Sequence, residues 1–120
     1  MRWTLQLGKE SGGFSFRVGV ASDAFSGYTE ATPTQSWFFR NHSMCADGHF
    51  QHGLFDSTAF AAGDVVTVEL ERARGVDGVL RVRVAGKIAR EWRGLPRDGM
   101  LCPIVCLCNS KQRYTMVALP

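Results

Sequence analysis

The sequence predicts an all-β fold, an antiparallel β-sandwich. Three observations predict it. Apolar residues recur at every second position along most of the chain, no segment of ten or more residues has helical spacing, and Gly/Asp-rich breaks separate the runs. Eight or nine short strands at regular intervals are typical of a β-sandwich. At 120 residues, the chain is expected to form one domain, residues 1–120.

The clearest element is the segment of residues 63–87. Two alternating runs flank a break rich in Gly and Asp, which predicts an antiparallel hairpin with one buried and one wet face. Arg81 and Arg83 fall on the wet face. The positions expected to face the core are Val66, Val68, Leu70, Leu80, Val82 and Val84.

Two strands are expected before it, at residues 2–7 and 14–20, and their closeness in sequence predicts that they pair as a hairpin. Gly19 indicates the close approach of a neighbouring chain or side chain. Residues 22–35 are polar and aperiodic, and long ordered loops of this kind are often functional. Residues 36–43 are expected to contain a strand with Trp37 and either Phe38 or Phe39 inward.

The C-terminal third predicts three more elements. A short return segment at residues 88–92 precedes a loop at 93–99. Residues 101–108 are apolar on both faces, which predicts a central strand covered on each side, with Pro103 at its first residue or at a bulge. Residues 113–119 are expected to be the closing strand.

Composition narrows the function classes. The 14 basic and 11 acidic residues give a net charge of +3, too small and too dispersed to argue strongly for nucleic acid. No run of about 18 apolar residues is present, so we expect no membrane span. The N-terminus lacks an apolar signal-peptide core, and the four cysteines, three of them on one strand, favour reduced thiols. We therefore expect an intracellular protein, cytoplasmic or nuclear.

Candidate chemistry is sparse. Cys45, His49 and His52, with His42 nearby, could supply metal ligands, but their spacing matches no common zinc pattern, so we expect no metal. On a strand, Cys102, Cys106 and Cys108 would point one way, and we expect them to pack as small apolar residues. The carboxylates are scattered in turns, and no pair or triad is designated. We expect no enzyme, no catalytic residues and no cofactor.

The order of short motifs resembles a SPRY domain over nearly the whole chain. Residues 16–22 (FRVGVAS) resemble the family's V-G strand, and residues 36–39 (SWFF) its Trp element. Residues 60–71 (FAAGDVVTVELE) are similar to its G-D-V strand. Further similar pieces are LRVRVAGK (80–87), WRGLPRDGMLCPIV (92–105) and YTMVAL (114–119). Ala85-Gly86 replaces the family's usual Asn-Gly, and no N-terminal PRY segment is seen.

The resemblance implies a bent antiparallel sandwich of two sheets with concanavalin-like, SPRY architecture. It also implies a non-catalytic protein–protein interaction domain, an adaptor or scaffold that recognises a peptide or protein partner through loops at one edge of the sandwich. In adaptor-type members, the loop after the V-G strand and the loop before the last strand contribute. The residues carried over as partner-binding candidates are Val20, Asp23, Phe25, Tyr28, Asn109, Ser110 and Lys111.

Two alternatives stay open. A basic outer face with Arg81, Arg83, Arg90, Arg93 and Arg97 would suit an RNA-associated or complex-scaffolding module. A lectin-like, carbohydrate-binding sandwich is the other alternative. Calcium-dependent lectins need clustered oxygen ligands, and the candidate residues here are dispersed, namely Asn41, Asp47 and Asp56.

Overall fold

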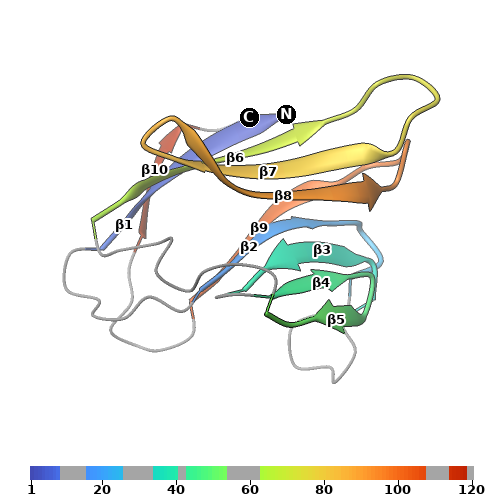
Figure 1. Ribbon diagram of the computed structural model, residues 1–120, viewed down its shortest axis with the longest axis horizontal. Helices are drawn as coiled ribbons and strands as arrows, with labels where there is room; N and C mark the ends of the chain where they lie inside the picture. The colour runs from blue at the N-terminus through green and yellow to red at the C-terminus, as the bar shows by residue number, and fades with distance from the viewer. Residues whose placement is uncertain (9–15, 26–33, 41–42, 54–62, 108–113, 119–120) are drawn as a thin grey trace.

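The computed structural model describes residues 1–8, 16–25, 34–40, 43–53, 63–107 and 114–118, with the backbone alone for Phe16, Leu107 and residues 114–118. These residues form two five-stranded sheets in which the pairings are antiparallel (Figure 1). The expected all-β antiparallel sandwich is confirmed. Within the described ranges there is no helix, and hence none with the length and apolarity to cross a membrane.

The first sheet has the strand order β10-β1-β6-β7-β8, and the second has the order β5-β4-β3-β2-β9. The first sheet consists of β1 (Arg2–Leu7), β6 (Val65–Glu71), β7 (Gly78–Val84), β8 (Lys87–Leu95) and β10 (Tyr114–Ala118). The second sheet consists of β2 (Phe16–Ala21), β3 (Ser36–Phe39), β4 (Met44–Ala46), β5 (His49–Gln51) and β9 (Cys102–Leu107).

The core lies between the two sheets and draws side chains from both. The alternating residues of β1, β6 and β7 supply one wall, and those of β2, β3 and β4 supply the other. The predicted hairpin at residues 63–87 is confirmed as β6 and β7, with Val68 opposite Val82 and Glu69 opposite Arg81. The buried cluster consists of Trp3, Leu5, Leu7, Val18, Val20, Trp37, Phe39, Met44, Val66, Val68, Leu70, Leu80, Val82 and Leu95.

The expected hairpin between the first two strands is wrong. β1 pairs with β6 on one side and with β10 on the other, whereas β2 lies in the second sheet between β3 and β9. Alternation shows which face of a strand is buried, and Trp3, Leu5 and Leu7 of β1 and Val18 and Val20 of β2 lie in the core. It does not show which strand lies alongside, so proximity in sequence was a poor guide here.

The strand at residues 101–108 was expected to be central, and this is also wrong. β9 pairs with β2 alone among the described strands and ends the second sheet. Pro103 lies inside β9 opposite Val20, a position that an edge strand tolerates because its other side makes no ladder hydrogen bonds. The apolar residues on its outer face are partly exposed rather than covered by another layer.

Gly19 accounts for the close packing of β2 on β3. A Cβ placed there would lie 2.1 Å from the carbonyl oxygen of Trp37 and 2.6 Å from the Cα of Phe38. The predicted close approach is therefore confirmed. Trp37 and Phe39 face the core, while Phe38 lies on the opposite face of the sheet and is nevertheless fully buried. Of the two phenylalanines that could have faced the core with Trp37, Phe39 is therefore the one that does so.

β8 is longer than the expected return segment, with nine residues, Lys87–Leu95. Its pairing with β7 shifts register near Ala89 and near Gly94, where the chain takes a φ of +103°. The first shift turns Arg90 toward the core side, opposite Val82, and the side chain is only 2% exposed. Arg90 was expected on an exposed basic face. Instead it donates a hydrogen bond from Nη1 to the carbonyl oxygen of Arg40, which follows β3 and so ties the two sheets together.

Candidate functional site

The two ends of the long β2–β3 connection are held together by hydrogen bonds. The backbone N–H of Ser22 donates to the carbonyl oxygen of Gln35 over 2.9 Å, and the Ser22 hydroxyl donates to Oε1 of Gln35 over the same distance. The amides of Ala24 and Phe25 donate back to the hydroxyl and carbonyl oxygens of Ser22 over 3.2 and 3.1 Å. The described part of this loop therefore starts and ends in a defined geometry.

The turn between β4 and β5 supports the same loop. Asp47 adopts a φ of +50° and accepts a hydrogen bond of 2.6 Å at Oδ1 from the backbone amide of Gln35, which itself has a φ of +61°. The Asp47 amide donates to the carbonyl oxygen of Ser36 over 2.8 Å. The sequence indicated a turn at Asp47-Gly48, but its support of a loop twelve residues away in sequence was missed. The available signal in the sequence was the Asp-Gly pair, because Asp before Gly favours a turn with positive φ.

The predicted partner-binding residues fall into three groups. Asp23 is exposed and Phe25 is half-buried, both in the described start of the β2–β3 loop. Val20 has no exposed surface and packs in the core, so its side chain supports this loop from beneath and is not available to a partner. Tyr28, together with Asn109, Ser110 and Lys111, lies outside the described residues.

The register of β2 and β9 places the start of β9, and not its end, beside the β2–β3 loop. Ala21, next to the β2–β3 loop, pairs with Cys102, while β9 ends at Leu107 beside Phe16. The strand leading to Asn109 thus ends about 17 Å along β2 from Ala21, at 3.3–3.4 Å per residue. The described neighbours of Asp23 and Phe25 are therefore the start of β9 and the loop before it.

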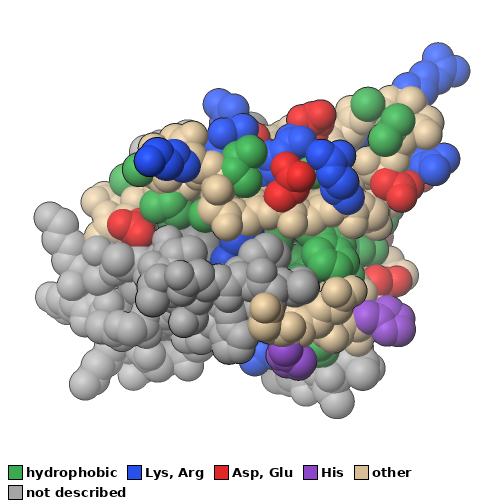
Figure 2. Space-filling model, viewed as in Figure 1, with side chains coloured by type: hydrophobic (Ala, Val, Ile, Leu, Met, Phe, Trp, Pro, Cys, Tyr) green, Lys and Arg blue, Asp and Glu red, His purple; other side chains and the backbone are tan. Residues whose placement is uncertain are grey.

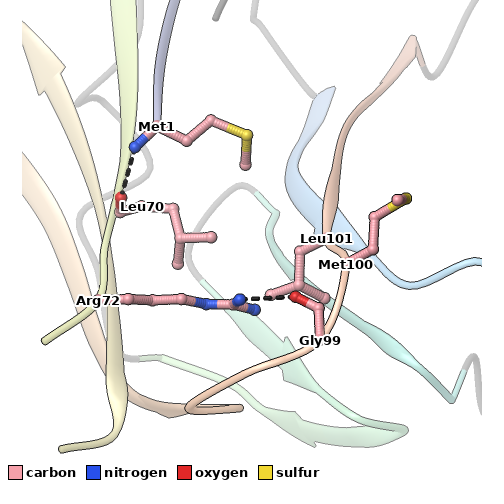
Figure 3. A pocket seen from close by; sticks show the side chains of 6 residues that line it. All are labelled: Met1, Leu70, Arg72, Gly99, Met100 and Leu101. Atoms are coloured by element: carbon pink, nitrogen blue, oxygen red, sulfur yellow. Dashed lines mark hydrogen bonds between the residues drawn. The ribbon is translucent and has the colours of Figure 1, made fainter. Parts of the chain in front are cut away.

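A cavity that sequence reasoning missed lies at this same end of the sandwich. Its volume is about 370 Å³, and it opens between the end of β6 and the β8–β9 loop, residues 96–101 (Figure 3). Leu101 precedes Cys102, the partner of Ala21, so the cavity adjoins the start of the β2–β3 loop. Its lining consists of Met1, Leu70, Arg72, Gly99, Met100 and Leu101.

Arg72 crosses this cavity. Its Nη1 donates to the carbonyl oxygen of Gly99 over 2.6 Å and so links the end of β6 to the β8–β9 loop (Figure 3). Its Nε and Nη2 are screened from solvent and have no hydrogen-bond acceptor among the described residues. Met100 beside it is 72% exposed, the most exposed large apolar side chain in the described part of the chain. A loop methionine after Gly99 was the sequence signal that could have drawn attention to this place.

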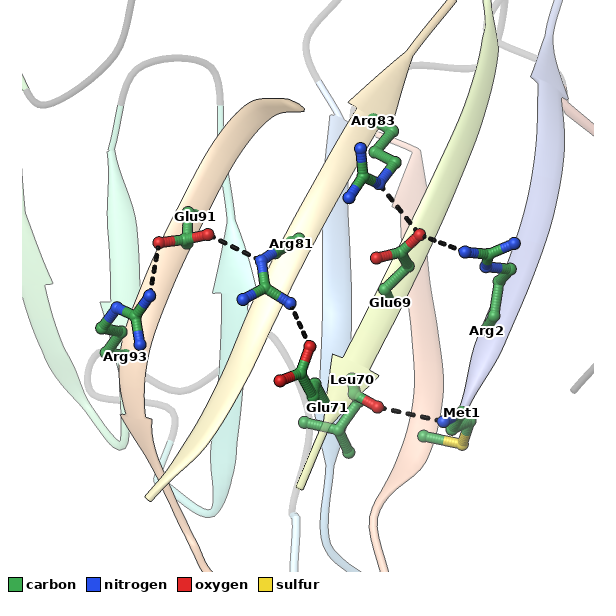
Figure 4. Close-up of polar contacts among 9 residues, drawn as sticks. All are labelled: Met1, Arg2, Glu69, Leu70, Glu71, Arg81, Arg83, Glu91 and Arg93. Atoms are coloured by element: carbon green, nitrogen blue, oxygen red, sulfur yellow. Dashed lines mark hydrogen bonds and ion pairs between the residues drawn. The ribbon is translucent and has the colours of Figure 1, made fainter. Parts of the chain in front are cut away.

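The outer face of the first sheet carries paired rather than free charges (Figure 4). Arg81 contacts Glu91 and Glu71, both at 2.6 Å, and Arg83 contacts Glu69 at 2.9 Å. Acidic and basic side chains are interspersed over this sheet in the space-filling view (Figure 2). Four arginines and three glutamates form this network, with a net charge of +1, in two separate clusters. Arg2 and Arg83 share Glu69, whereas Arg81 joins Glu71 to Glu91, which also contacts Arg93.

The arginines proposed as a basic face therefore do not present a uniform positive surface. Arg97 contacts Asp77 at 2.9 Å, and Arg90 is buried between the sheets. The hydrogen bonds that Arg81 donates to Glu71 and Glu91 raise the pKa of Arg81, which keeps that guanidinium charged and held in the network. Ion pairing of this kind lowers the potential that would attract a phosphate backbone.

The Cys/His run does not converge on one point. Cys45 pairs with Phe50 on the outer face of the second sheet, while His49 pairs with Ala46 and points to the other face. Over the described ranges, no three Cys, His, Asp or Glu side chains are placed to share a metal ion. Burial raises the pKa of the Cys45 thiol, so it stays protonated and unreactive at neutral pH.

The cysteines of β9 are less buried than expected. Cys102 and Cys106 share the outer face of β9 with Ile104, as the alternation predicted, but Cys102 is exposed and Cys106 is half-buried. Their expected role as packed core residues is wrong for Cys102, because β9 ends the sheet among the described strands and this side chain is exposed. Cys108 lies outside the described residues.

The chain matches no protein-family model and no curated protein. Its function must therefore be argued from its own geometry. The end of the sandwich at the β2–β3 and β8–β9 loops combines a hydrogen-bonded loop, an apolar cavity and the Arg72 guanidinium. These are components of a binding site.

Proposed function

We propose that this chain is an intracellular, non-catalytic protein-interaction domain of the SPRY kind, which recognises a peptide or protein partner through one end of its sandwich. That end, called the loop end below, consists of the described residues 22–25, 34–35, 47–48, 72–77 and 96–101. The order of SPRY-like motifs supports the proposal, as does the two-sheet architecture.

The observation that carries the proposal is the contrast between rigidity and exposure at the loop end. The β2–β3 loop is held at its base by hydrogen bonds from Ser22, Gln35 and Asp47. On two other connections, the β6–β7 loop and the β8–β9 loop, Val76 and Met100 are 55% and 72% exposed. Apolar side chains presented by braced loops bind a partner at little entropic cost, because the surface is already ordered before association.

Site-specific photo-crosslinking tests this placement. A benzoylphenylalanine introduced at Asp23, Val76 or Met100 is expected to crosslink the same partner in cells. The control position is Lys87, an exposed residue at the opposite end of β7, beside the Ala85-Gly86 turn. It is expected to give no crosslink to that partner. Equal crosslinking from Lys87, or none from the three loop-end positions, would show that the loop end is not the interaction surface.

A further inference from the structure

The Arg72 guanidinium is fixed in place with one edge unused. Its Nη1 is engaged by the carbonyl oxygen of Gly99, which sets the plane of the group. Nε and Nη2, the two donors that find no acceptor in the described part of the chain, lie on a single edge of the fork. Two parallel N–H groups on one guanidinium edge match the spacing of the two oxygens of a carboxylate, the geometry of bidentate recognition.

Arg72 also differs from most other arginines of the loop end and the first sheet. No carboxylate lies within ion-pair distance of it in the described part of the chain, so its charge is available to a ligand. The arginines that do have carboxylate partners are Arg2, Arg81, Arg83, Arg93 and Arg97. A buried donor pair without an acceptor is unusual in folded proteins, so we expect a ligand to supply the acceptor.

The wall around this edge is apolar. Leu70 and Leu101 lie beside the guanidinium, and Met1 and Met100 complete the lining (Figure 3). Methionine side chains are unbranched and adjust to ligands of different shape. A volume of about 370 Å³ has room for one large side chain together with a carboxylate group.

We propose that this cavity binds a peptide segment in which a glutamate or aspartate side chain lies next to a large apolar residue such as leucine, methionine or phenylalanine. The carboxylate accepts from Nε and Nη2 of Arg72, and the apolar side chain packs against Leu70, Leu101 and Met100. The inference rests on the proposed function and names the chemistry of the partner.

The local charge favours an acidic ligand. Residues 72–77 and 96–101 contain three arginines and two aspartates, and Arg97 is already paired with Asp77. These two segments carry one positive charge in excess, and the Met1 ammonium, which donates to the carbonyl oxygen of Leu70, adds a second at the cavity. Because Nε and Nη2 have almost no solvent contact, the ligand enters as side chains at the mouth move apart, and the highly exposed Met100 is the one least held by neighbours.

The first test uses labelled octapeptides with amidated C-termini, in which Leu-Glu, Met-Glu or Phe-Asp stands in a Gly/Ser background. Each has a Gln or Asn counterpart of the same shape. Fluorescence polarisation is expected to show at least tenfold tighter binding of the acid than of the amide, since a lost bidentate contact to a charged group costs about that factor or more. The Nε–H resonance of Arg72 in an NMR titration is expected to shift with the acid alone.

Variants at Arg72 separate recognition from folding. Arg72→Lys keeps the positive charge on a long side chain but lacks the two-donor edge, so the acid-to-amide ratio is expected to fall below about threefold. The matched control is Arg74→Lys, an exposed residue of the same β6–β7 loop, which is expected to leave the ratio unchanged. Circular dichroism checks that both variants fold.

Several results would overturn the inference. These are equal binding of acid and amide, no binding of any acidic peptide, an unchanged ratio in Arg72→Lys, preference for a phosphoserine peptide, or binding only when the peptide's C-terminal carboxylate is free. If they occur while crosslinks still map to Asp23, Val76 and Met100, the interaction surface stands and only its ligand chemistry is wrong. Loss of those crosslinks as well would contradict both the interaction surface and its ligand chemistry.

Discussion

At the scale of single residues, the tight turn between β7 and β8 carries backbone strain. Ala85 and Gly86 form a two-residue connection from Val84 to Lys87, with φ angles of +52° and +79°. Both lie in the left-handed region, as a type I′ turn requires. Glycine adopts this conformation freely, whereas the Cβ of alanine costs roughly 1–2 kcal/mol there. The absence of the usual Asn-Gly pair in the sequence already indicated this cost.

We therefore expect Ala85→Asn to stabilise the protein. Asparagine tolerates the left-handed region better than alanine, so the free energy of unfolding is expected to rise by about 0.5–1 kcal/mol. Urea denaturation followed by circular dichroism measures it. Ala73→Asn is the control, an exposed loop alanine that is not among the residues with positive φ, and it is expected to give no gain. Equal effects of the two substitutions would contradict the strain at Ala85.

Sequence alternation predicted side-chain faces well, except where the backbone changes its phase. Val66, Val68 and Leu80 are buried as expected. Arg90 is not on the wet face, because the register shift near Ala89 turns the strand. No residue type marks that shift, so the sequence could not show it. Arg72 was missed for a related reason, since its unused donors depend on where Gly99 lies in space.

At the scale of elements, the outer face of the first sheet is held by an ion-pair network that crosses four strands, β1, β6, β7 and β8 (Figure 4). A hydrogen bond from Arg81, helped by the charges of Arg81 and Arg93, lowers the pKa of Glu91. Cross-strand pairs of this kind favour one register over its neighbours, because a one-residue slip would bring the charges to the other face.

This network predicts a defined pH dependence. Since the folded pKa of Glu91 lies below its unfolded value of about 4.3, ionised Glu91 stabilises the fold above that pH, and the contribution is lost as the pH falls through the folded pKa. Glu91→Gln is thus expected to be less stable than the native chain at pH 7, with a difference that shrinks below pH of about 4.

Urea titrations at a series of pH values measure that difference. Asp98→Asn serves as the control, because Asp98 is exposed and forms no ion pair within the described ranges. Its effect is expected to be small throughout. A Glu91→Gln difference that stays constant down to pH of about 3 would show that the carboxylate contributes through shape rather than charge.

Strand pairing was the part of the fold that sequence reasoning predicted least. Nearly every strand was found, but β1 and β2 belong to different sheets and β9 lies at an edge. Pairing depends on contacts between residues far apart in sequence, such as Arg2 with Glu69. Alternation reflects only the positions within one strand and does not show which strand pairs with it. The candidate site has the same limitation, because the loop end is assembled from five separate segments.

At the scale of the whole molecule, the two sheets share one core, so neither can keep its apolar face buried alone. Trp3 belongs to the first sheet and Trp37 to the second, and both lie in the same buried cluster. A single domain of this size is expected to unfold in one cooperative transition when its layers share their core in this way.

We therefore expect tryptophan probes in the two sheets to report the same unfolding transition. One variant retains Trp3 alone, with Trp37→Phe and Trp92→Phe, and the other retains Trp37 alone, with Trp3→Phe and Trp92→Phe. Because these substitutions lower stability by different amounts, fluorescence is compared with far-ultraviolet circular dichroism within each variant, where the urea midpoints and slopes are expected to coincide. A fluorescence midpoint that precedes the circular-dichroism midpoint in one variant alone would show that one sheet opens before the other, and that the sandwich is not a single cooperative unit.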